Sequence, residues 1–152
     1  MTLKAVLALG IVVLAGMQMF GPARTNPPTA PGQALAAKVP VPDHIQTVLQ
    51  RSCMDCHSNE THWPWYSYVA PMSWGVIGDV NEGRDHMNIS DWRYSPEEGA
   101  ELLDGMCKQV KRRRMPLTAY TWVHWSAKLT DDEIKQVCTW ANDSAERLVA
   151  SH

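Results

Sequence analysis

The chain has 152 residues, of which 45% are hydrophobic and 20% are charged, with 14 basic and 16 acidic side chains. This length fits one domain with an appendage and excludes a multidomain enzyme. The apolar and charged fractions argue against wholesale disorder, and the formal net charge of −2 argues against a nucleic-acid-binding protein. Seven Trp and eight Met against a single Phe suggest a large, flat, apolar ligand.

The first predicted element is an apolar helix over residues 5–20, preceded by one positive side chain, Lys4. Its length lies between that of a signal-peptide core and that of a membrane-spanning helix. The small-x-small sequence directly behind it, Gly21-Pro22-Ala23, has a proline in the middle and is a poor cleavage signal, so we favour an uncleaved anchor. A cleaved signal peptide is the alternative. Both export the rest of the chain and keep Lys4 in the cytoplasm.

A Pro-rich stretch follows the apolar helix. Residues 21–42 contain six prolines and show no periodicity, which is typical of a linker. We therefore divide the chain into a signal anchor or signal peptide at 1–22, a linker at 23–42 and a folded domain at 43–152.

The first half of the folded domain combines helical and irregular segments. Asp43 is a candidate cap for a helix that runs toward Cys53. Residues 58–73, rich in Trp, Pro, Tyr and Ser, indicate a loop. A short helix is expected over residues 72–80 and should break near Gly83.

The second half carries two strong helix-start signals. Ser95 and Glu98 form a predicted capping box with Pro96 at the first helical position. Thr130 and Glu133 form a second capping box, followed by a helical apolar stripe. No segment alternates with a period of two residues, so the predicted fold class is all-α.

A CxxCH motif occupies residues 53–57. Cys53 and Cys56 are spaced so that each can add to one haem vinyl group, and His57 is then held against the iron as its proximal ligand. A zinc site would need further ligands, and the sequence holds no second CxxC and no HxxxH. The motif therefore predicts one covalently attached haem c, with a zinc or thiol site as the alternative.

The predicted distal iron ligand is Met115. Pro116 ends the preceding helix and stiffens the loop that carries the thioether. Methionine opposite histidine raises the reduction potential relative to two nitrogen ligands. His124 is the rival that would give a bis-histidine haem. The other competing methionines are Met54, Met72, Met87 and Met106.

Four segments together carry a family resemblance: CMDCHSNETHWPWYSYVAPMSW, GRDHMNISDW, RMPL and HWSAKLTDDE. They resemble the bacterial haem-binding domain family of small c-type cytochromes, over nearly all of residues 43–140. The resemblance implies an exported, membrane-anchored, cytochrome-c-like domain with a single haem. It makes Cys53 and Cys56 the attachment sites, His57 the proximal ligand and Met115, at the family's Met-Pro position, the distal ligand.

Other side chains are candidates for contact with the haem. Trp63, Trp65 and Tyr66 are expected to wall it or to hydrogen-bond its propionates, with core packing as the alternative. Arg84 is a candidate partner for a propionate.

Two cysteines lie outside the motif. Cys107 and Cys138 each fall on the apolar face of a predicted helix, where they are either buried thiols or a disulfide. A disulfide would close a loop of about 32 residues and stabilise the fold by roughly 3–4 kcal/mol. Because Met115 lies inside that loop, the bridge would also hold the distal ligand. The basic run at 108–114 is either a docking surface for an acidic redox partner or a solvated helix end.

We therefore predict a monohaem c-type cytochrome domain that carries single electrons on the periplasmic side, anchored to the inner membrane by residues 5–20. Its partners are redox proteins, and it acts alone or as a subunit of a larger complex, without nucleic acid. The sequence shows no catalytic constellation, so an electron carrier is favoured over an enzyme. A haem-based peroxidase or gas sensor with a labile Met115 is one alternative, and a binding module without haem is the other.

Overall fold

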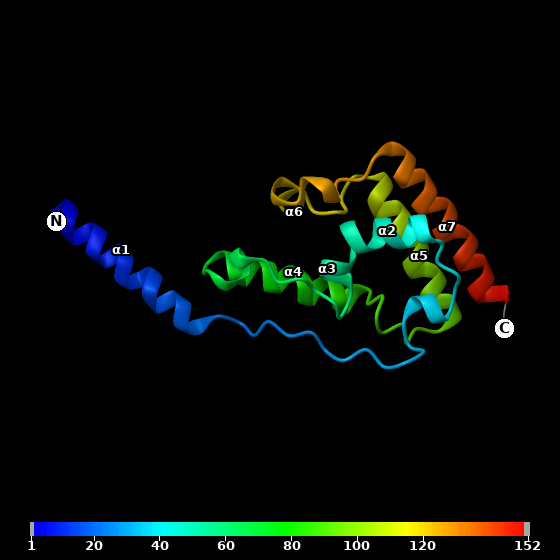
Figure 1. The fold of residues 1–152 in the computed structure, drawn as a ribbon, viewed down its shortest axis with the longest axis horizontal. Helices are drawn as coiled ribbons and strands as arrows, with labels where there is room; N and C mark the ends of the chain where they lie inside the picture. The colour runs from blue at the N-terminus through cyan, green and yellow to red at the C-terminus, as the bar shows by residue number, and fades with distance from the viewer. Residues whose placement is uncertain (1, 151–152) are drawn as a thin grey trace.

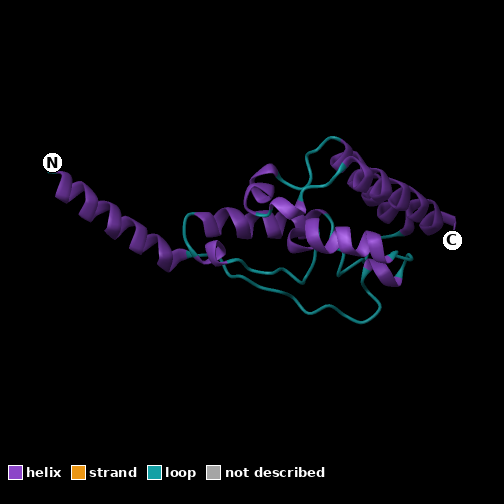
Figure 2. Ribbon diagram, turned by 45° about the horizontal axis from the view of Figure 1, so that its top comes forward, coloured by secondary structure: helices purple, strands orange, loops and turns teal. Residues whose placement is uncertain are grey.

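The computed structural model describes residues 2–150, and every regular element in that range is helical. Figures 1 and 2 show a single N-terminal helix projecting from a helical domain, which confirms the all-α prediction. The elements are α1 (Leu3–Met17), η1 (Gln18–Phe20), η2 (Leu35–Ala37), α2 (Asp43–Ser52), α3 (Met54–His57), η3 (Trp65–Tyr68), α4 (Met72–His86), α5 (Pro96–Lys111), α6 (Thr118–Val123), η4 (Trp125–Ala127) and α7 (Asp131–Ala150).

The N-terminal helix stands apart from the domain. The stretch Leu3–Phe20, which combines α1 and η1, is the one described segment long and apolar enough to cross a membrane, and none of it is buried. A helix with apolar side chains on all sides and no protein cover is typical of a membrane span or a signal sequence.

Helices α5 and α7 pack lengthwise on each other and form the most extensive helix contact of the domain (Figure 1). Both predicted capping boxes are present. The Ser95 Oγ accepts from the Glu98 amide at 3.2 Å and the Glu98 carboxylate accepts from the Ser95 amide at 2.9 Å. Thr130 and Glu133 repeat the pattern at the start of α7. Local capping therefore fixes where each helix of the pair begins.

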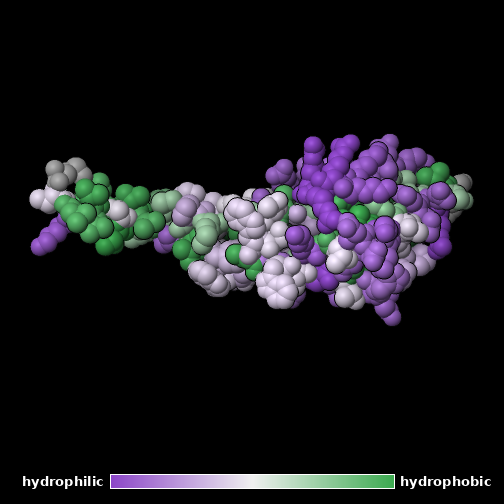
Figure 3. All heavy atoms as spheres, turned by 90° about the horizontal axis from the view of Figure 1, so that it is seen from above, coloured by the Kyte–Doolittle hydropathy of each residue, from purple (hydrophilic) through white to green (hydrophobic). Residues whose placement is uncertain are grey.

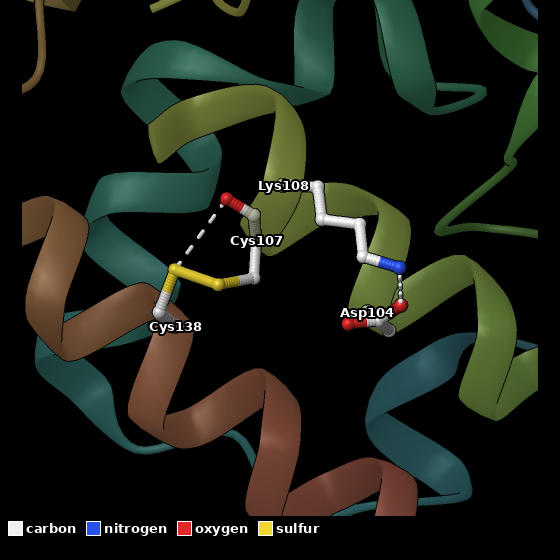
Figure 4. The surroundings of a disulfide bond; sticks show 4 residues. All are labelled: Asp104, Cys107, Lys108 and Cys138. Carbon is white, nitrogen blue, oxygen red and sulfur yellow. Dashed lines mark hydrogen bonds and ion pairs between the residues drawn. A yellow bond between two sulfur atoms is a disulfide. The ribbon is translucent and has the colours of Figure 1, made fainter. Parts of the chain in front are cut away.

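The two cysteines outside the CxxCH motif are bonded to each other. The disulfide joins Cys107 of α5 to Cys138 of α7, as Figure 4 shows, so the disulfide alternative is confirmed. Lys108 forms an ion pair with Asp104 on the solvent side of the same helix.

The hydrophobic core extends into the second half of the predicted linker. Leu35 and Val39 are buried among core residues of α2, α5 and α7. The Leu35 amide donates to the Ile89 carbonyl at 2.9 Å, and the indole N–H of Trp140 donates to the Pro40 carbonyl at 2.9 Å. Local composition gives no sign of this packing, because Pro-rich segments lack the periodicity that marks a core-facing element.

Two local predictions were wrong. Helix α2 starts at Asp43 itself, with Pro42 in the cap position, so the Asp43 carboxylate lies in the first turn rather than capping it. Helix α4 continues through Gly83 to His86 instead of breaking near the glycine. A tertiary contact explains the second difference: Gly83 lies directly against the backbone of Cys56.

Candidate haem attachment site

The CxxCH residues lie on one tight turn between two helices. Helix α2 ends at Ser52, Cys53 leaves helical geometry with φ −128° and ψ −41°, and α3 follows immediately. The His57 amide donates to the Cys53 carbonyl at 2.9 Å, which closes the turn. This turn brings the two thiols and the imidazole together. Neither Cys53 nor Cys56 is in a disulfide.

Gly83 allows helix α4 to cross close to this turn. A Cβ at Gly83 would lie 2.7 Å from the Cys56 carbonyl oxygen, closer than any real Cβ contact. Only glycine fits there without a backbone shift. The sequence signal for this contact was an isolated glycine in a helical pattern, which also marks a close backbone approach.

The His57 ring is oriented by a backbone carbonyl. Its Nδ1 lies 3.0 Å from the Met87 oxygen, so Nδ1 carries the proton and Nε2 is left as the ligand nitrogen. Burial lowers the pKa of His57, and its hydrogen bonds to backbone atoms of Met87 and Gly83 only partly offset that effect. The imidazole is therefore neutral at pH 7, which is the form that binds a metal ion.

The two motif thiols are protonated at neutral pH. Burial raises the pKa of Cys53 to about 12, with a further contribution from Cys56. Burial also raises the pKa of Cys56 to about 11, with Asp79 and Asp55 adding to the effect. Because the thiolate is the reactive form, burial makes both thiols less reactive than exposed cysteines.

The residues that follow the motif hold its shape. The Thr61 hydroxyl donates to the Asp55 carbonyl at 2.7 Å, and the Ser58 hydroxyl donates to the Met54 carbonyl at 2.7 Å. The Ile89 amide donates to the His57 carbonyl at 2.8 Å. Residues 58–61, with the sequence SNET, therefore hold the CxxCH turn in shape, and we call them the SNET scaffold.

Arg84 forms hydrogen bonds that connect the linker to this scaffold. Its Nε donates to the Ser58 carbonyl at 2.7 Å, and its Nη1 donates to the Thr25 carbonyl at 2.8 Å. Its Nη2 donates to Asn26 Oδ1 at 3.0 Å and to Thr61 Oγ1 at 2.8 Å. These bonds use four of the five guanidinium N–H groups. The pairing of Arg84 with a propionate stays a prediction.

Exposed aromatic side chains are found on three short elements near the motif. On η3, Trp65 is 74% exposed, whereas on α6 and η4 Trp122 is 80% and Trp125 is 82% exposed. Trp63 and Tyr66 are half-buried. Large apolar side chains that the chain itself leaves uncovered fit contact with a flat apolar group. Together with the two free thiols and the oriented imidazole, they fit a haem.

Helix α6 is tied to the CxxCH turn by polar contacts that sequence reasoning missed. The Tyr120 hydroxyl donates to Asp55 Oδ2 at 2.7 Å. The His124 ring stacks on the Tyr120 ring with centroids 4.4 Å apart, and His124 Nε2 lies 2.6 Å from the Tyr66 hydroxyl. The rival distal ligand His124 is therefore engaged with protein partners.

Met115 lies in the connection between α5 and α6 and is 36% exposed. The Arg113 guanidinium ties this connection to the start of α7, since it donates to the Leu129 carbonyl at 2.9 Å and forms an ion pair with Asp131. Of the competing methionines, Met72 is exposed, whereas the other three are buried in the core or packed against it: Met54, Met87 and Met106.

The zinc alternative finds no support among the described residues. Within residues 2–150, no group of three or more His, Cys, Asp or Glu side chains is placed to hold a metal ion, as a protein zinc site requires.

The fold and the site define a small helical haem-binding protein. The chain belongs to the haem-binding domain family, whose sequence model matches residues 12–143. This match confirms the resemblance seen in the sequence.

The chain is also similar to a curated protein, the cytochrome c peroxidase Ccp of Escherichia coli (strain K12). The two are 24% identical over 112 residues, which cover 68% of this chain and 23% of the peroxidase. The chain thus spans less than a quarter of the length of that relative. No solved structure is a significant match.

Proposed function

We propose that this chain is a monohaem c-type cytochrome domain that carries single electrons on the periplasmic side of the inner membrane. The observation that supports this most is the contrast between the two cysteine pairs. Cys107 and Cys138 are oxidised to a disulfide, whereas Cys53 and Cys56 stay free beside an oriented His57. Free thiols at CxxCH spacing followed by histidine suit covalent attachment of one haem.

Each residue of the site has a separate role in this proposal. Cys53 and Cys56 would hold the group through thioether bonds, His57 would bind the iron through Nε2, and Met115 would bind it through its sulfur. The bound haem supplies a reversible one-electron couple. The chain fixes the histidine tautomer through the Met87 carbonyl and limits access of water with the aromatic side chains.

The segment that carries Met115 is fastened on both sides. The Cys107–Cys138 disulfide and Arg113 fix its start relative to α7. The hydrogen bond from Tyr120 to Asp55 fixes its far end to the CxxCH turn. We infer that these ties position the Met115 thioether for iron binding, because a ligand on a loop needs such support to keep one geometry.

The cellular location follows from the N-terminal helix and the disulfide. Helix α1 suits a retained anchor, with Lys4 on the cytoplasmic side. A disulfide between Cys107 and Cys138 suits an oxidising compartment such as the bacterial periplasm.

The partner surface is proposed to be the basic segment beside Met115. Lys111, Arg112 and Arg114 are exposed there, whereas Arg113 is engaged with Asp131. An exposed positive surface beside the distal ligand steers an acidic redox protein toward the haem edge. Electron-transfer rates with such a partner should fall as salt is added, and an unchanged rate would contradict this surface.

A redox titration with an optical readout tests the proposed function. The full chain matured in an exporting host should show a reversible one-electron transition between two low-spin forms. Met115→Ala should lower the reduction potential and abolish the spectroscopic signature of methionine ligation, whereas the matched variant Met72→Ala should leave both unchanged. The reverse pattern would reassign the ligand, and an irreversible or high-spin protein would contradict an electron carrier.

The similarity to a cytochrome c peroxidase supports a second candidate function, a haem peroxidase or gas sensor in which Met115 dissociates. The exposure of Met115 on a connecting segment is compatible with such release. Two results would favour this candidate over the electron carrier. One is rapid carbon monoxide uptake by the ferrous protein at neutral pH. The other is a rate of peroxide turnover in the wild type that equals the rate in Met115→Ala.

A further inference from the structure

An apolar tip lies where the N-terminal helix meets the domain. It consists of exposed large side chains from η1 and from the stretch that runs from the last residue of η3 to the first residue of α4: Met19, Phe20, Tyr68, Val69 and Met72. These side chains come from parts of the chain about 50 residues apart in sequence. Nothing in the proposed haem chemistry requires them to be together.

Hydrogen bonds hold the two parts of the apolar tip together. The Gln18 side chain accepts from the Ala70 amide at 2.9 Å and donates to the Ala70 carbonyl at 3.4 Å. Arg24, just beyond the helix, donates to the Ser67 carbonyl at 3.0 Å, and its guanidinium carbon lies 4.1 Å from the centre of the Tyr68 ring. These contacts bind the domain to the last turn of the apolar helix and to the residues that follow it.

The two segments that meet at the apolar tip lack Asp, Glu, Lys and Arg. Residues 5–23 and residues 61–78 contain no Asp, Glu, Lys or Arg, although one residue in five of the whole chain is charged. Figure 3 shows the same division: the projecting helix is hydrophobic, the adjoining part of the domain is near neutral, and the far part is hydrophilic. Uncharged surface with exposed aromatic side chains is typical of the region where a protein meets a bilayer.

The length of the helix sets where this tip would lie. The apolar stretch Leu3–Phe20 has 18 residues. At about 1.5 Å per residue it spans roughly 27 Å, close to the hydrocarbon thickness of about 30 Å. Gln18 then falls at the membrane boundary, and the segment bonded to it falls at the level of the lipid headgroups.

We propose that the apolar tip docks on the outer surface of the bilayer that α1 spans. The domain would then be held against the membrane and would not move freely on a flexible linker. The inference depends on the retained anchor of the proposed function. The bilayer is favoured over a protein partner because the tip is continuous with the spanning helix. Arg24 above Tyr68 provides the cation and ring that interfacial sites commonly use.

Docking would also fix the height of the haem site. Two linker residues, Thr25 and Asn26, accept hydrogen bonds from Arg84, which also binds the SNET scaffold. A third linker residue, Arg24, binds the apolar tip. The CxxCH turn is thereby held relative to the bilayer, so that redox partners would meet it at one distance from the membrane.

A depth measurement on the full chain in lipid nanodiscs tests the docking. With Cys107 and Cys138 bonded and the two motif cysteines taken up by haem, Val69→Cys introduces a single free thiol for a nitroxide label. The matched control is Asn142→Cys, at an exposed position on α7 at the far end of the domain. Met72→Cys serves as a second tip position should the first variant fail to fold.

For each label we compare its accessibility to oxygen with its accessibility to a water-soluble nickel chelate. The expected result is that the ratio of oxygen to nickel accessibility is several-fold higher at positions 69 and 72 than at position 142. Equal ratios at all three positions would overturn the docking. Spin–spin broadening at position 69 that disappears when each nanodisc holds one chain would assign the tip to a second copy and would also overturn it. A mature chain without residues 1–22 by mass spectrometry would overturn it as well.

The same samples separate this inference from the proposed function. Haem staining and the optical spectrum are recorded for each labelled variant. Labels in the aqueous phase on a haem-loaded, methionine-ligated protein would reject the docking alone. For a chain that carries no haem, the label is placed in the Cys53→Ala/Cys56→Ala background, where the introduced cysteine is again the single free thiol. Labels at the bilayer in that background would support the docking, and the absence of haem from the parent chain would reject the cytochrome assignment. A spectrum altered in both tip variants would show that the tip covers the haem and would overturn the docking.

Discussion

The two halves of the folded domain differ in how their apolar surfaces are covered. In the α5–α7 half, side chains such as Leu103 and Val137 are buried and a disulfide closes the pair. In the half built from α3, η3 and α6, side chains such as Trp65 and Trp122 stay exposed and two thiols stay free. The α5–α7 half completes its core with protein side chains. The half built from α3, η3 and α6 is, in our proposal, completed by haem.

This difference separates the effects expected of mutations. Changes in the α5–α7 half should reduce the free energy of unfolding whether or not haem is bound. Changes around the CxxCH turn should first reduce haem incorporation or iron ligation. The following variants test how sharp that division is, from the largest expected effect to the smallest.

The double variant Cys107→Ala/Cys138→Ala removes the covalent link of the closed half. Loss of a bridge between residues 31 apart should lower the free energy of unfolding by about 3–4 kcal/mol. Denaturant unfolding of the haem-loaded protein measures it. Because Met115 lies between the two cysteines, the fraction of methionine-ligated protein should also fall. Unchanged stability and unchanged ligation would show that the bridge supports neither the fold nor the distal ligand.

Gly83→Ala introduces a methyl group at the crossing of α3 and α4. Because the new Cβ would meet the Cys56 carbonyl, overpacking should destabilise the protein by about 1–3 kcal/mol and reduce the yield of attached haem.

The matched control is Gly78→Ala in the same helix, where nothing lies within 4 Å of the added Cβ. Its better helix propensity should stabilise the protein by up to about 1 kcal/mol. Thermal unfolding and haem staining of both variants make the comparison. Equal behaviour of the two alanines would show that the close approach of α4 to the CxxCH turn is wrong.

Tyr120→Phe removes one hydroxyl that joins α6 to the CxxCH turn. Loss of the bond to the Asp55 carboxylate should cost roughly 1.5 kcal/mol, since hydrogen bonds to charged groups are stronger than neutral ones. The ferric protein should then show a weaker methionine–iron charge-transfer band. Tyr68→Phe, whose ring packs beside Arg24, is the control and should leave the band unchanged. If both variants keep the full band, α6 does not position Met115.

The ion pair between Arg51 of α2 and Glu133 of α7, with a nitrogen–oxygen distance of 2.8 Å, joins α2 to the α5–α7 pair. Burial tends to raise the pKa of Glu133, but hydrogen bonds from Thr130 and Arg51 outweigh it and hold that pKa below its ordinary value of 4.5. The stabilisation is therefore complete above pH 4.5 and is lost as the pH falls through the lower pKa of the folded state.

Glu133→Gln should accordingly lower the free energy of unfolding by about 0.5–1 kcal/mol at pH 7, because the pair is partly exposed and screened. The difference from the wild type should shrink as the solution is acidified below pH 4.5. Denaturant titrations at several pH values measure this effect. A difference that stays constant with pH would show that the carboxylate charge is not what stabilises the contact.

The features predictable from sequence were those encoded by neighbouring residues. The capping boxes at Ser95 and Thr130 set the starts of α5 and α7, and the spacing of Cys53, Cys56 and His57 marks the attachment turn. Each signal extends over five residues or fewer. Short-range hydrogen bonds and covalent geometry determine them, so local reasoning is sufficient.

The features that sequence reasoning missed depend on residues far apart in the chain. Asp55 meets Tyr120 across 65 positions, and Leu35 enters the core although its neighbours are typical of a linker. The hydrogen bonds of Arg84 to the Ser58 and Thr25 carbonyls were likewise not foreseen, and its pairing with a propionate stays a prediction. Such pairings depend on tertiary packing, which the local pattern of one sequence does not encode.

The central claim is that the CxxCH turn binds one haem covalently and that Met115 completes the iron coordination. Intact mass spectrometry, paired with oxidised and reduced optical spectra of the full chain from an exporting host with a working haem-attachment system, tests it most directly. Our account predicts a mass increase of one haem that survives denaturation, its loss in Cys53→Ala/Cys56→Ala, and a low-spin methionine-ligated spectrum. A mature chain that carries no added haem mass would contradict it.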